Sequence, residues 1–461
     1  MQRLTGLLLF LLAIVHHGSY AQNAKTIQKT LDELLSAEFK PAEPGIVVLI
    51  VQKGKEVYKK GFGSANMELD VPMQPGMIFK IGSITKQFTA VGILRLLEEG
   101  KLSLQDSVQK FIPGFPSKGH TITIEHLLTH TSGIKDYMTI DHPDPYIERH
   151  DFTPEFLIEH FKNAPLEFIP GTRYNYTNSG YVLLGYIIQK ITGEEYHTYI
   201  TEKVIKPAGL SHTQFANENT ILPGRVSGYT RDAGYYENTY WQRISIGYAA
   251  GDLLSTAEDL YTWTIALRSY KVIKKESLEK AFTPYVLADG KATGYGYGWF
   301  NNLLHGKKCI HHEGQVSGFI SMEAYFPEQD NFVCILTNVK SGEDKTDFSD
   351  RRFRIFDRIV GVSLGEPLQK GIMLSSAVLD SYTGTYQLAT DSSRTIMLFR
   401  ENDFLLAKIS GQGTVKLLFT SANIFEIESI PGVKGELVSE NGKVIKMVIT
   451  QGGRYEWKKI K

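Results

Sequence analysis

Runs typical of buried β-strands occur near both ends of the first three-quarters of the chain, with a long stretch of helical and loop patterns between them. The first run, IVVLIV, begins after Gly45 and ends at the turn Lys53-Gly54-Lys55, where a hairpin is expected. The second group lies between Tyr295 and Asn338, where KKCIHH, GFISMEAYF and NFVCILTN are typical of an antiparallel meander. The pattern predicts an α+β domain whose sheet is assembled from its two termini.

Apolar residues at helical spacing predict a helix over residues 83–99, which is expected to stop at Gly100. The residues that form its apolar stripe are Phe88, Val91, Leu94 and Leu97. Helices and loops are expected between Pro113 and about residue 275, and DFSDRRFRIFDRIVG predicts a further helix after the meander.

The residue pattern of the sequence changes near Gly365. After a predicted linker over residues 365–375 come about eight short β-type runs, from GTYQL to RYEWKK, separated by Gly, Asn, Asp and Pro. They predict a separate small all-β domain over residues 376–461, an antiparallel, lipocalin-like barrel or a sandwich. At roughly 100 to 200 residues per domain, a chain of 461 residues is long enough for two or three domains.

The first 21 residues have the shape of a secretory signal: Arg3, an apolar run from Leu4 to Val15, and the small-residue ending Ser19-Tyr20-Ala21. Cleavage is expected after Ala21, which leaves a first domain over residues 22–364; an uncleaved amphipathic anchor is the alternative. No later run is long enough to span a bilayer. Asn175-Tyr176-Thr177, the only glycan acceptor pattern, overlaps a candidate site residue, which favours a bacterial protein, periplasmic or secreted.

Composition excludes several classes of partner and site. Fifty basic and fifty acidic side chains balance, without the basic excess of a nucleic-acid binder. Two cysteines, Cys309 and Cys334, are too few for a disulfide scaffold or a cysteine-based zinc site. Walker and dinucleotide glycine motifs are absent, so the sequence indicates no cofactor.

A serine and a lysine stand three residues apart at the start of the predicted helix, in Gly82-Ser83-Ile84-Thr85-Lys86. A serine hydroxyl becomes a good nucleophile only when a base takes its proton, and a desolvated lysine can be that base. Free N–H groups at a helix start can stabilise an oxyanion. The G-x-S-x-G elbow of α/β-hydrolases is absent. Alone, the S-x-x-K spacing is also compatible with a solvated surface lysine.

Two further motifs give this pair a context. Tyr176-Thr177-Asn178 precedes a predicted helix, and His312-Glu313-Gly314 ends a strand of the meander. With ITIEHLLTHTSGI, AAGDLLSTAEDL and YGYGWF between them, these motifs resemble the serine β-lactamase-related superfamily. The match is to the branch of class C β-lactamases, D,D-carboxypeptidases, D-aminopeptidases and family VIII esterases, over residues 25 to 360. The resemblance implies the β-lactamase/transpeptidase-like fold, an antiparallel sheet flanked by helices plus an all-helical region.

Residue by residue, the resemblance implies Ser83 as the acylated nucleophile and Lys86 as its base or proton partner. Tyr176 would be a phenolate-like proton shuttle, stabilised by the Lys86 cation and by His312 if that ring is charged. The remaining residues would bind substrate: Asn178 at the amide or ester side, His312 and Gly314 in the third motif, and Gln315, whose N–H would form the oxyanion hole with that of Ser83. No metal is implied.

Glu313 departs from the family pattern, because relatives that recognise a carboxylate carry a small hydroxyl residue or glycine there. If Glu313 faces the cleft, it disfavours penicillins and peptidyl-D-alanine through like-charge repulsion. We therefore expect an exported serine hydrolase that cleaves an ester or an amide, as an esterase or D-amino-acid peptidase. The alternatives are a β-lactamase or D,D-carboxypeptidase, and a Glu313 that points away from the cleft.

Two other classes of protein stay open. His126 and His130, spaced i and i+4, could bind zinc, but the glutamate of a zinc peptidase helix is absent between them. A catalytically weak penicillin-binding-like receptor would keep the cleft, with the C-terminal domain as its recognition part. A small molecule or peptide is the expected partner, and the sequence does not indicate an oligomeric state.

Overall fold

A computed structural model of the chain describes residues 24–142, 144, 147–217, 219–232, 235–240, 242–341, 348–368, 372–409, 414–427, 430–450 and 453–461. The predicted signal segment therefore lies outside the described residues. The chain divides into two compact units, residues 1–342 and 343–461. The predicted boundary at residue 364 and the linker over residues 365–375 remain predictions. Within the described residues, no helix is both long and apolar enough to cross a membrane.

The first unit is built on a six-stranded sheet with the order β10-β11-β12-β13-β1-β2. The strands are β1 (Ile46–Gln52), β2 (Lys55–Phe62), β10 (Phe300–Leu304), β11 (Lys307–Val316), β12 (Phe319–Phe326) and β13 (Asn331–Thr337). Strand β1 pairs antiparallel with β13, so Leu49 lies opposite Cys334. The prediction of one sheet assembled from both ends of the domain is confirmed.

The two faces of this sheet are covered by different parts of the chain. Val47, Leu49 and Cys334 face the core that the helical region shares with the sheet. Residues 24–38 form a helix on the opposite face, where Asp32 accepts a hydrogen bond from Tyr58 at 2.8 Å. The sheet is therefore a middle layer, as expected for an antiparallel sheet flanked by helices.

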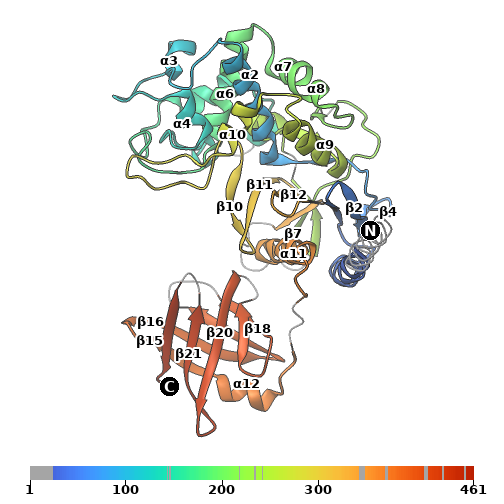
Figure 1. Ribbon diagram of the computed structural model, residues 1–461, viewed down its shortest axis with the longest axis vertical. Helices are drawn as coiled ribbons and strands as arrows, with labels where there is room; N and C mark the ends of the chain where they lie inside the picture. The colour runs from blue at the N-terminus through green and yellow to red at the C-terminus, as the bar shows by residue number, and fades with distance from the viewer. Residues whose placement is uncertain are drawn as a thin grey trace, which may run out of the picture. The chain divides into compact units, whose positions relative to one another are not determined.

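The helical region of the first unit lies between β2 and β10 in sequence, and Figure 1 shows its helices gathered at one end of the sheet. Its helices are α2 (Thr85–Glu98), α3 (Val108–Phe111), α4 (Ile124–Leu128), α5 (Pro154–Lys162), α6 (Asn178–Thr192), α7 (Tyr196–Ile200), α8 (Lys206–Ala208), α9 (Ala257–Arg268) and α10 (Lys275–Phe282). Helix α2 is buried on nearly every side, and its Phe88 stacks on Trp263 at 4.3 Å. The predicted stop is confirmed, because Gly100 has a φ of +68°.

The region predicted as helices and loops also contains strands, which corrects that prediction. Two small three-stranded sheets have the orders β5-β9-β6 and β14-β7-β8. Their strands are β5 (Phe79–Lys80), β6 (Gln214–Phe215), β7 (Tyr229–Asp232), β8 (Tyr235–Asn238), β9 (Leu253–Ser255) and β14 (Val339–Ser341). Strands of two to four residues are too short to show an alternating pattern, so no pattern in the sequence predicts them.

The second unit contains helix α11 (Phe348–Ser363), helix α12 (Ser376–Tyr382) and a closed barrel of eight strands. The barrel strands are β15 (Gly384–Leu388), β16 (Asp391–Glu401), β17 (Phe404–Ile409), β18 (Thr414–Phe419), β19 (Ile424–Ile427), β20 (Ile430–Glu440), β21 (Lys443–Thr450) and β22 (Arg454–Lys459). Apolar side chains such as Tyr386, Phe425 and Met447 form its own core. The predicted C-terminal barrel is confirmed.

Both cysteines are expected to be free, inert thiols. Cys309 and Cys334 lie on β11 and β13, with β12 between them, and they are three residues out of register, so their Cα atoms are more than roughly 9.6 Å apart, beyond the ~7 Å limit of a disulfide. Cys334 also faces the helical core, as Ile310 on β11 does. Cys309 is next to Ile310 in the strand, so its side chain points to the opposite face of the sheet from Cys334. Burial raises the pKa of both thiols. Mass spectrometry of non-reduced protein, alkylated after denaturation, should find two labelled thiols; a Cys309–Cys334 link would contradict the strand order.

Candidate active site

Ser83 lies in a tight turn, Gly82–Ile84, that leads directly into helix α2. Gly82 has a φ of +51°, and a Cβ atom there would lie 2.8 Å from the backbone nitrogen of Gln315 on β11. Only glycine permits both the backbone conformation and this close approach. The turn therefore brings half-buried Ser83 beside the strand that carries the third motif.

Lys86 lies one helical turn further on and is fully buried. Its Nζ lies 3.0 Å from the Oγ of Ser83, 2.8 Å from the Oδ1 of Asn178 and 2.9 Å from the carbonyl oxygen of Ala250. Burial lowers the pKa of Lys86 from 10.5 to about 7, and the nearby charge of Asp136 partly opposes this. The amine is therefore substantially neutral at neutral pH, the form a base requires.

The partners of Lys86 determine where its lone pair points. A neutral amine has two N–H groups and one lone pair. The oxygens of Asn178 and Ala250 can only accept, so they take the two N–H groups. The remaining position faces Ser83, whose hydroxyl can donate. In its neutral form, Lys86 thus directs its lone pair at the proton of the candidate nucleophile.

Tyr176 completes the group around Ser83, and the ammonium position of Lys86 lies 4.8 Å from the centre of its ring. Burial raises the pKa of Tyr176 well above 10, while Ser83 is near enough to lower it in part. The Tyr176 hydroxyl is buried and makes no hydrogen bond of good geometry with any described residue. The free site thus favours a neutral phenol, not the phenolate-like group that the resemblance implied.

His312 differs from the expectation that it replaces a cationic lysine. It is almost completely buried, and burial lowers its pKa from 6.5 to about 3, so the ring is neutral. Its Nδ1 faces the carbonyl oxygen of Glu313, which can only accept, so Nδ1 carries the proton. Its Nε2 then accepts from the Tyr295 hydroxyl at 3.0 Å. With both nitrogens occupied, His312 offers no charge to stabilise a phenolate.

Asn178 makes hydrogen bonds to two other residues of the site, Asp136 and Lys86. Both its backbone N–H and its side-chain amide donate to the Oδ2 of Asp136, at 2.9 Å each. Its Oδ1 accepts from Lys86. The side chain therefore orients the lysine, and its expected hydrogen bond to substrate stays a prediction.

The third motif lies on β11, whose pairing with β10 ends at His311. Strand β10 therefore does not pair with His312, Glu313 or Gly314. A Cβ atom at Gly314 would lie 1.9 Å from the carbonyl oxygen of Ile81, so glycine is required there. Glu313 is half-buried and lies opposite Met322, so it occupies the face of β11 away from His312. Burial raises the pKa of its carboxyl group.

The two histidines of the zinc alternative take different structural hydrogen bonds. The Nδ1 of His126 accepts from the backbone N–H of Thr123 at the start of α4. The Nδ1 of His130 accepts from the backbone N–H of Thr177, and its ring packs 4.2 Å from that of Tyr176. Among the described residues, no three acidic, cysteine or histidine side chains gather as a metal site would need.

Sequence reasoning missed several residues that contact the catalytic group: Asp136, Ala250, Tyr295 and His130. Asp136 is 42 positions from Asn178, and Ala250 acts through a backbone carbonyl that any residue would supply. Neither relation leaves a local spacing signal. Asp136 follows the segment ITIEHLLTHTSGI and Ala250 lies in AAGDLLSTAEDL, and only these segments, which the resembling family shares, could have indicated them.

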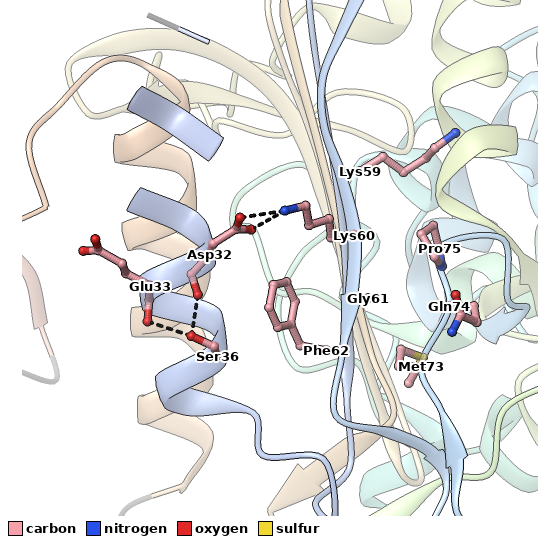
Figure 2. Close-up of a pocket in the computed structure, with 10 residues that line it drawn as sticks. All are labelled: Asp32, Glu33, Ser36, Lys59, Lys60, Gly61, Phe62, Met73, Gln74 and Pro75. Carbon is pink, nitrogen blue, oxygen red and sulfur yellow. Dashed lines mark hydrogen bonds and ion pairs between the residues drawn. The ribbon is translucent and has the colours of Figure 1, made fainter. Parts of the chain in front are cut away.

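A cavity of about 670 Å³ lies apart from Ser83, between the helix of residues 24–38 and strand β2 (Figure 2). Its charged groups are largely paired: Lys60 forms an ion pair with Asp32 at 2.6 Å, and Lys59 lies 2.9 Å from Glu56. The cavity is lined by Asp32, Glu33, Ser36, Lys59, Lys60, Gly61, Phe62, Met73, Gln74 and Pro75. None of the candidate catalytic residues lines it.

The geometry places a serine hydroxyl beside a buried lysine of lowered pKa at the start of a buried helix. The model of the Beta-lactamase family matches residues 24–354. This match covers more than half of the chain, and the chain belongs to the Beta-lactamase family.

Known relatives agree with this assignment. The chain is 28% identical to penicillin-binding protein 4* of Bacillus subtilis (strain 168) over 407 residues, 83% of this chain and 88% of that protein. The octameric penicillin-binding protein homologue from Pyrococcus abyssi has a TM-score of 0.65 at 28% identity, covering 93% of this chain and 99% of that one. A D-stereospecific amidohydrolase from Streptomyces sp. has a TM-score of 0.57 at 26% identity, covering 64% and 89%.

Proposed function

We propose that the protein is a serine hydrolase that cleaves an ester or an amide through an acyl-enzyme on Ser83. The single observation that carries the proposal is the geometry of Lys86, whose lone pair faces the Ser83 hydroxyl at 3.0 Å while two acceptors hold its N–H groups. A buried lysine with a pKa of about 7 has little use on structural grounds alone, because desolvating it costs free energy. Perturbed groups of this kind cluster at functional sites.

Acylation would begin when Lys86 takes the proton of Ser83 and the Ser83 Oγ attacks the substrate carbonyl carbon. The oxyanion would be stabilised by the backbone N–H groups of Ser83 and Gln315, which the close approach at Gly82 brings together. The tetrahedral intermediate collapses when the bond to the leaving group breaks and Lys86 returns the proton to that group. This step leaves an acyl-Ser83 ester and a neutral lysine.

Deacylation would repeat the sequence with water as the nucleophile. The neutral amine takes a proton from water, the hydroxide attacks the acyl carbon, and Ser83 leaves with the proton that Lys86 holds. Tyr176 contributes as a neutral phenol beside Ser83, where its buried hydroxyl can accept one proton and donate another in the same step. In this relay a neutral phenol passes protons, whereas in general base catalysis a tyrosine phenolate would remove the proton.

The neutral state of His312 favours substrates that carry no carboxylate near the third motif. The site supplies no histidine cation there, since both nitrogens of His312 are occupied. Glu313 lies on the other face of β11 from His312, so it adds repulsion only if its ionised carboxylate reaches the substrate past the strand edge. Esters, neutral amides and peptides with a free amino terminus are therefore preferred over penicillins and peptidyl-D-alanine. The D-stereospecific amidohydrolase that resembles this chain supports the amide alternative.

A panel of three substrates tests this function: a short p-nitrophenyl ester, a D-amino-acid amide and a chromogenic cephalosporin. We expect turnover of the ester or the amide and at most slow turnover of the lactam. Acylation of Ser83 without product release would instead support the penicillin-binding-like receptor. The proposal fails if none of the three acylates or is hydrolysed.

If the Glu313 carboxylate reaches the substrate, Glu313→Thr is expected to raise kcat/KM for carboxylate-bearing substrates by roughly tenfold, and that for the neutral ester by less than about twofold, because it removes like-charge repulsion. The effect should shrink as the pH falls through the raised pKa of Glu313, where the carboxyl group becomes neutral. Steady-state kinetics of both substrate types measure it. Efficient lactam hydrolysis by the unmodified protein would contradict this explanation.

Export to the periplasm or the medium is part of the proposal, and it rests on the signal-like shape of residues 1–21. Amino-terminal sequencing of protein recovered from expressing cells tests it. A mature chain that begins at Gln22 supports export, and a chain that retains Met1 contradicts it.

A further inference from the structure

The carboxylate of Asp136 is a group that the proposed mechanism has not yet used. Its Oδ2 accepts from the backbone N–H and from the side-chain amide of Asn178, and its Oδ1 accepts from the backbone N–H of Met138, all at 2.9 Å. Its three partners are therefore all N–H donors. The carboxylate faces the amide that in turn faces Lys86, so it stands one residue away from the proposed base.

This carboxylate decides which way round the Asn178 amide points. An ionised carboxylate can only accept hydrogen bonds, so it selects the NH₂ end of the amide. The other end of the amide, Oδ1, must then face Lys86, at 2.8 Å. The backbone N–H of Asn178 donates to the same carboxylate oxygen, and this second hydrogen bond holds the Asp136 carboxylate beside the Asn178 side chain.

The orientation matters because Lys86 has only one lone pair. With Oδ1 towards it, the amine gives its two N–H groups to Asn178 and Ala250 and keeps the lone pair for Ser83. If the amide were reversed, its NH₂ group would face the amine and would compete with the Ser83 hydroxyl for that lone pair. A reversed amide would thus leave the lysine in place but impair it as a base.

We infer that Asp136 is a positioning residue of the proposed acylation: it locks the Asn178 amide with its oxygen towards Lys86 and places a negative charge beside that lysine. The inference rests on the proposed function and adds to it a residue outside the three motifs. Asp136 does not need to touch the substrate, since it acts through Asn178.

The negative charge of Asp136 has a separate effect, on the pKa of Lys86. Asp136 raises the pKa of Lys86, against the larger effect of burial, which lowers it. Removing the charge should therefore lower the pKa of Lys86 further, and the neutral base should form at lower pH. A residue with a merely structural role would not move this midpoint.

Three substitutions separate the charge from the hydrogen bonds. Asp136→Asn removes the charge but can keep an oxygen for Asn178. Its new NH₂ group should turn towards Met138, because it then meets one N–H donor, whereas on the other side it would meet the two N–H donors of Asn178. Asp136→Ala removes both the charge and the acceptor. Asp136→Glu restores a carboxylate. Asp106→Asn is the matched control, because Asp106 also accepts a backbone N–H, from Ser103, and does not contribute to the pKa of Lys86.

The measurement is the rate of Ser83 acylation by a p-nitrophenyl ester as a function of pH, with thermal unfolding of each variant as a check on folding. Asp136→Asn should move the midpoint to lower pH by roughly one unit and keep the plateau rate within about threefold. Asp136→Ala should show the same direction of shift and a plateau lower by roughly tenfold or more. Asp136→Glu should return the midpoint towards that of the wild type, and Asp106→Asn should change neither quantity.

An unchanged midpoint in folded Asp136→Asn and Asp136→Ala would overturn the inference, even if both variants are slower. If those two variants do not fold, Asp136→Glu is the remaining test. A midpoint in Asp136→Glu that is lower than that of the wild type by roughly one pH unit, the shift expected for loss of the charge, would overturn the inference as well. Failure of the proposed function is distinguishable, because wild-type protein would then show no acylation of Ser83 at any pH.

Discussion

Ser83→Ala is expected to lower kcat/KM for an ester or amide substrate by on the order of 10³-fold or more, because it removes the only atom that forms the covalent intermediate. The substitution removes one oxygen from a half-buried side chain that is hydrogen-bonded to Lys86. The melting temperature should therefore change by no more than a few degrees. Progress curves with the best substrate of the panel, together with a thermal melt, measure both quantities.

Ser36→Ala is the matched control for this loss. Ser36 donates to the carbonyl oxygen of Asp32 on the helix of residues 24–38 and lies apart from Ser83, in the wall of the cavity in Figure 2. Its replacement makes the same chemical change and should leave turnover unaltered. Full activity in Ser83→Ala would end the acyl-enzyme proposal, and so would loss of wild-type activity on chelation.

Lys86→Met is expected to produce a loss of similar size, because methionine fills the buried site but has no basic lone pair. The rise of activity with pH around neutrality should disappear with it, since the group that titrates near pH 7 is gone. Lys110→Met, at an exposed ion pair with Asp106, is the control and should retain both rate and pH dependence. A Lys86→Met variant with a wild-type pH profile would show that another group is the base.

Lys86→Met should also change how the free energy of unfolding depends on pH. The folded-state pKa of Lys86, about 7, lies below its ordinary 10.5, so between these values the unfolded chain binds a proton that the native protein does not. Stability therefore rises with pH across this window by about 1.4 kcal/mol per unit, and Lys86→Met should lack that increment. Denaturant unfolding of both proteins at pH 7, 8 and 9 measures the difference. A constant difference would indicate that Lys86 titrates outside the window.

The sheet and the barrel could be predicted because their strands are long and strongly patterned. The runs IVVLIV and GFISMEAYF became β1 and β12, and Gly100 ended α2 where the helical stripe ends. Strand β20 left a weaker signal, because Gly435 interrupts its pattern. The structure explains that glycine: a Cβ atom there would lie 2.1 Å from the ring of Phe425.

The S-x-x-K spacing predicted Ser83 and Lys86 as neighbours because both lie at the start of one helix, where a separation of three residues fixes their distance. The roles of Tyr176 and His312 could not be fixed in this way. Whether a tyrosine is a phenolate, or a histidine a cation, depends on burial and on partners such as Tyr295, which lies 17 positions from His312. The charge state of a site emerges only from packing.

The measurement that tests the central claim most directly is peptide mapping of the protein quenched during reaction with a p-nitrophenyl ester at several pH values. The account predicts an acyl group on Ser83, in the tryptic peptide IGSITK, absent from Ser83→Ala, and formed at a rate that rises with pH with a midpoint near 7. An adduct on another residue, or a rate that does not change between pH 6 and pH 8, would contradict a Ser83 nucleophile activated by a neutral Lys86.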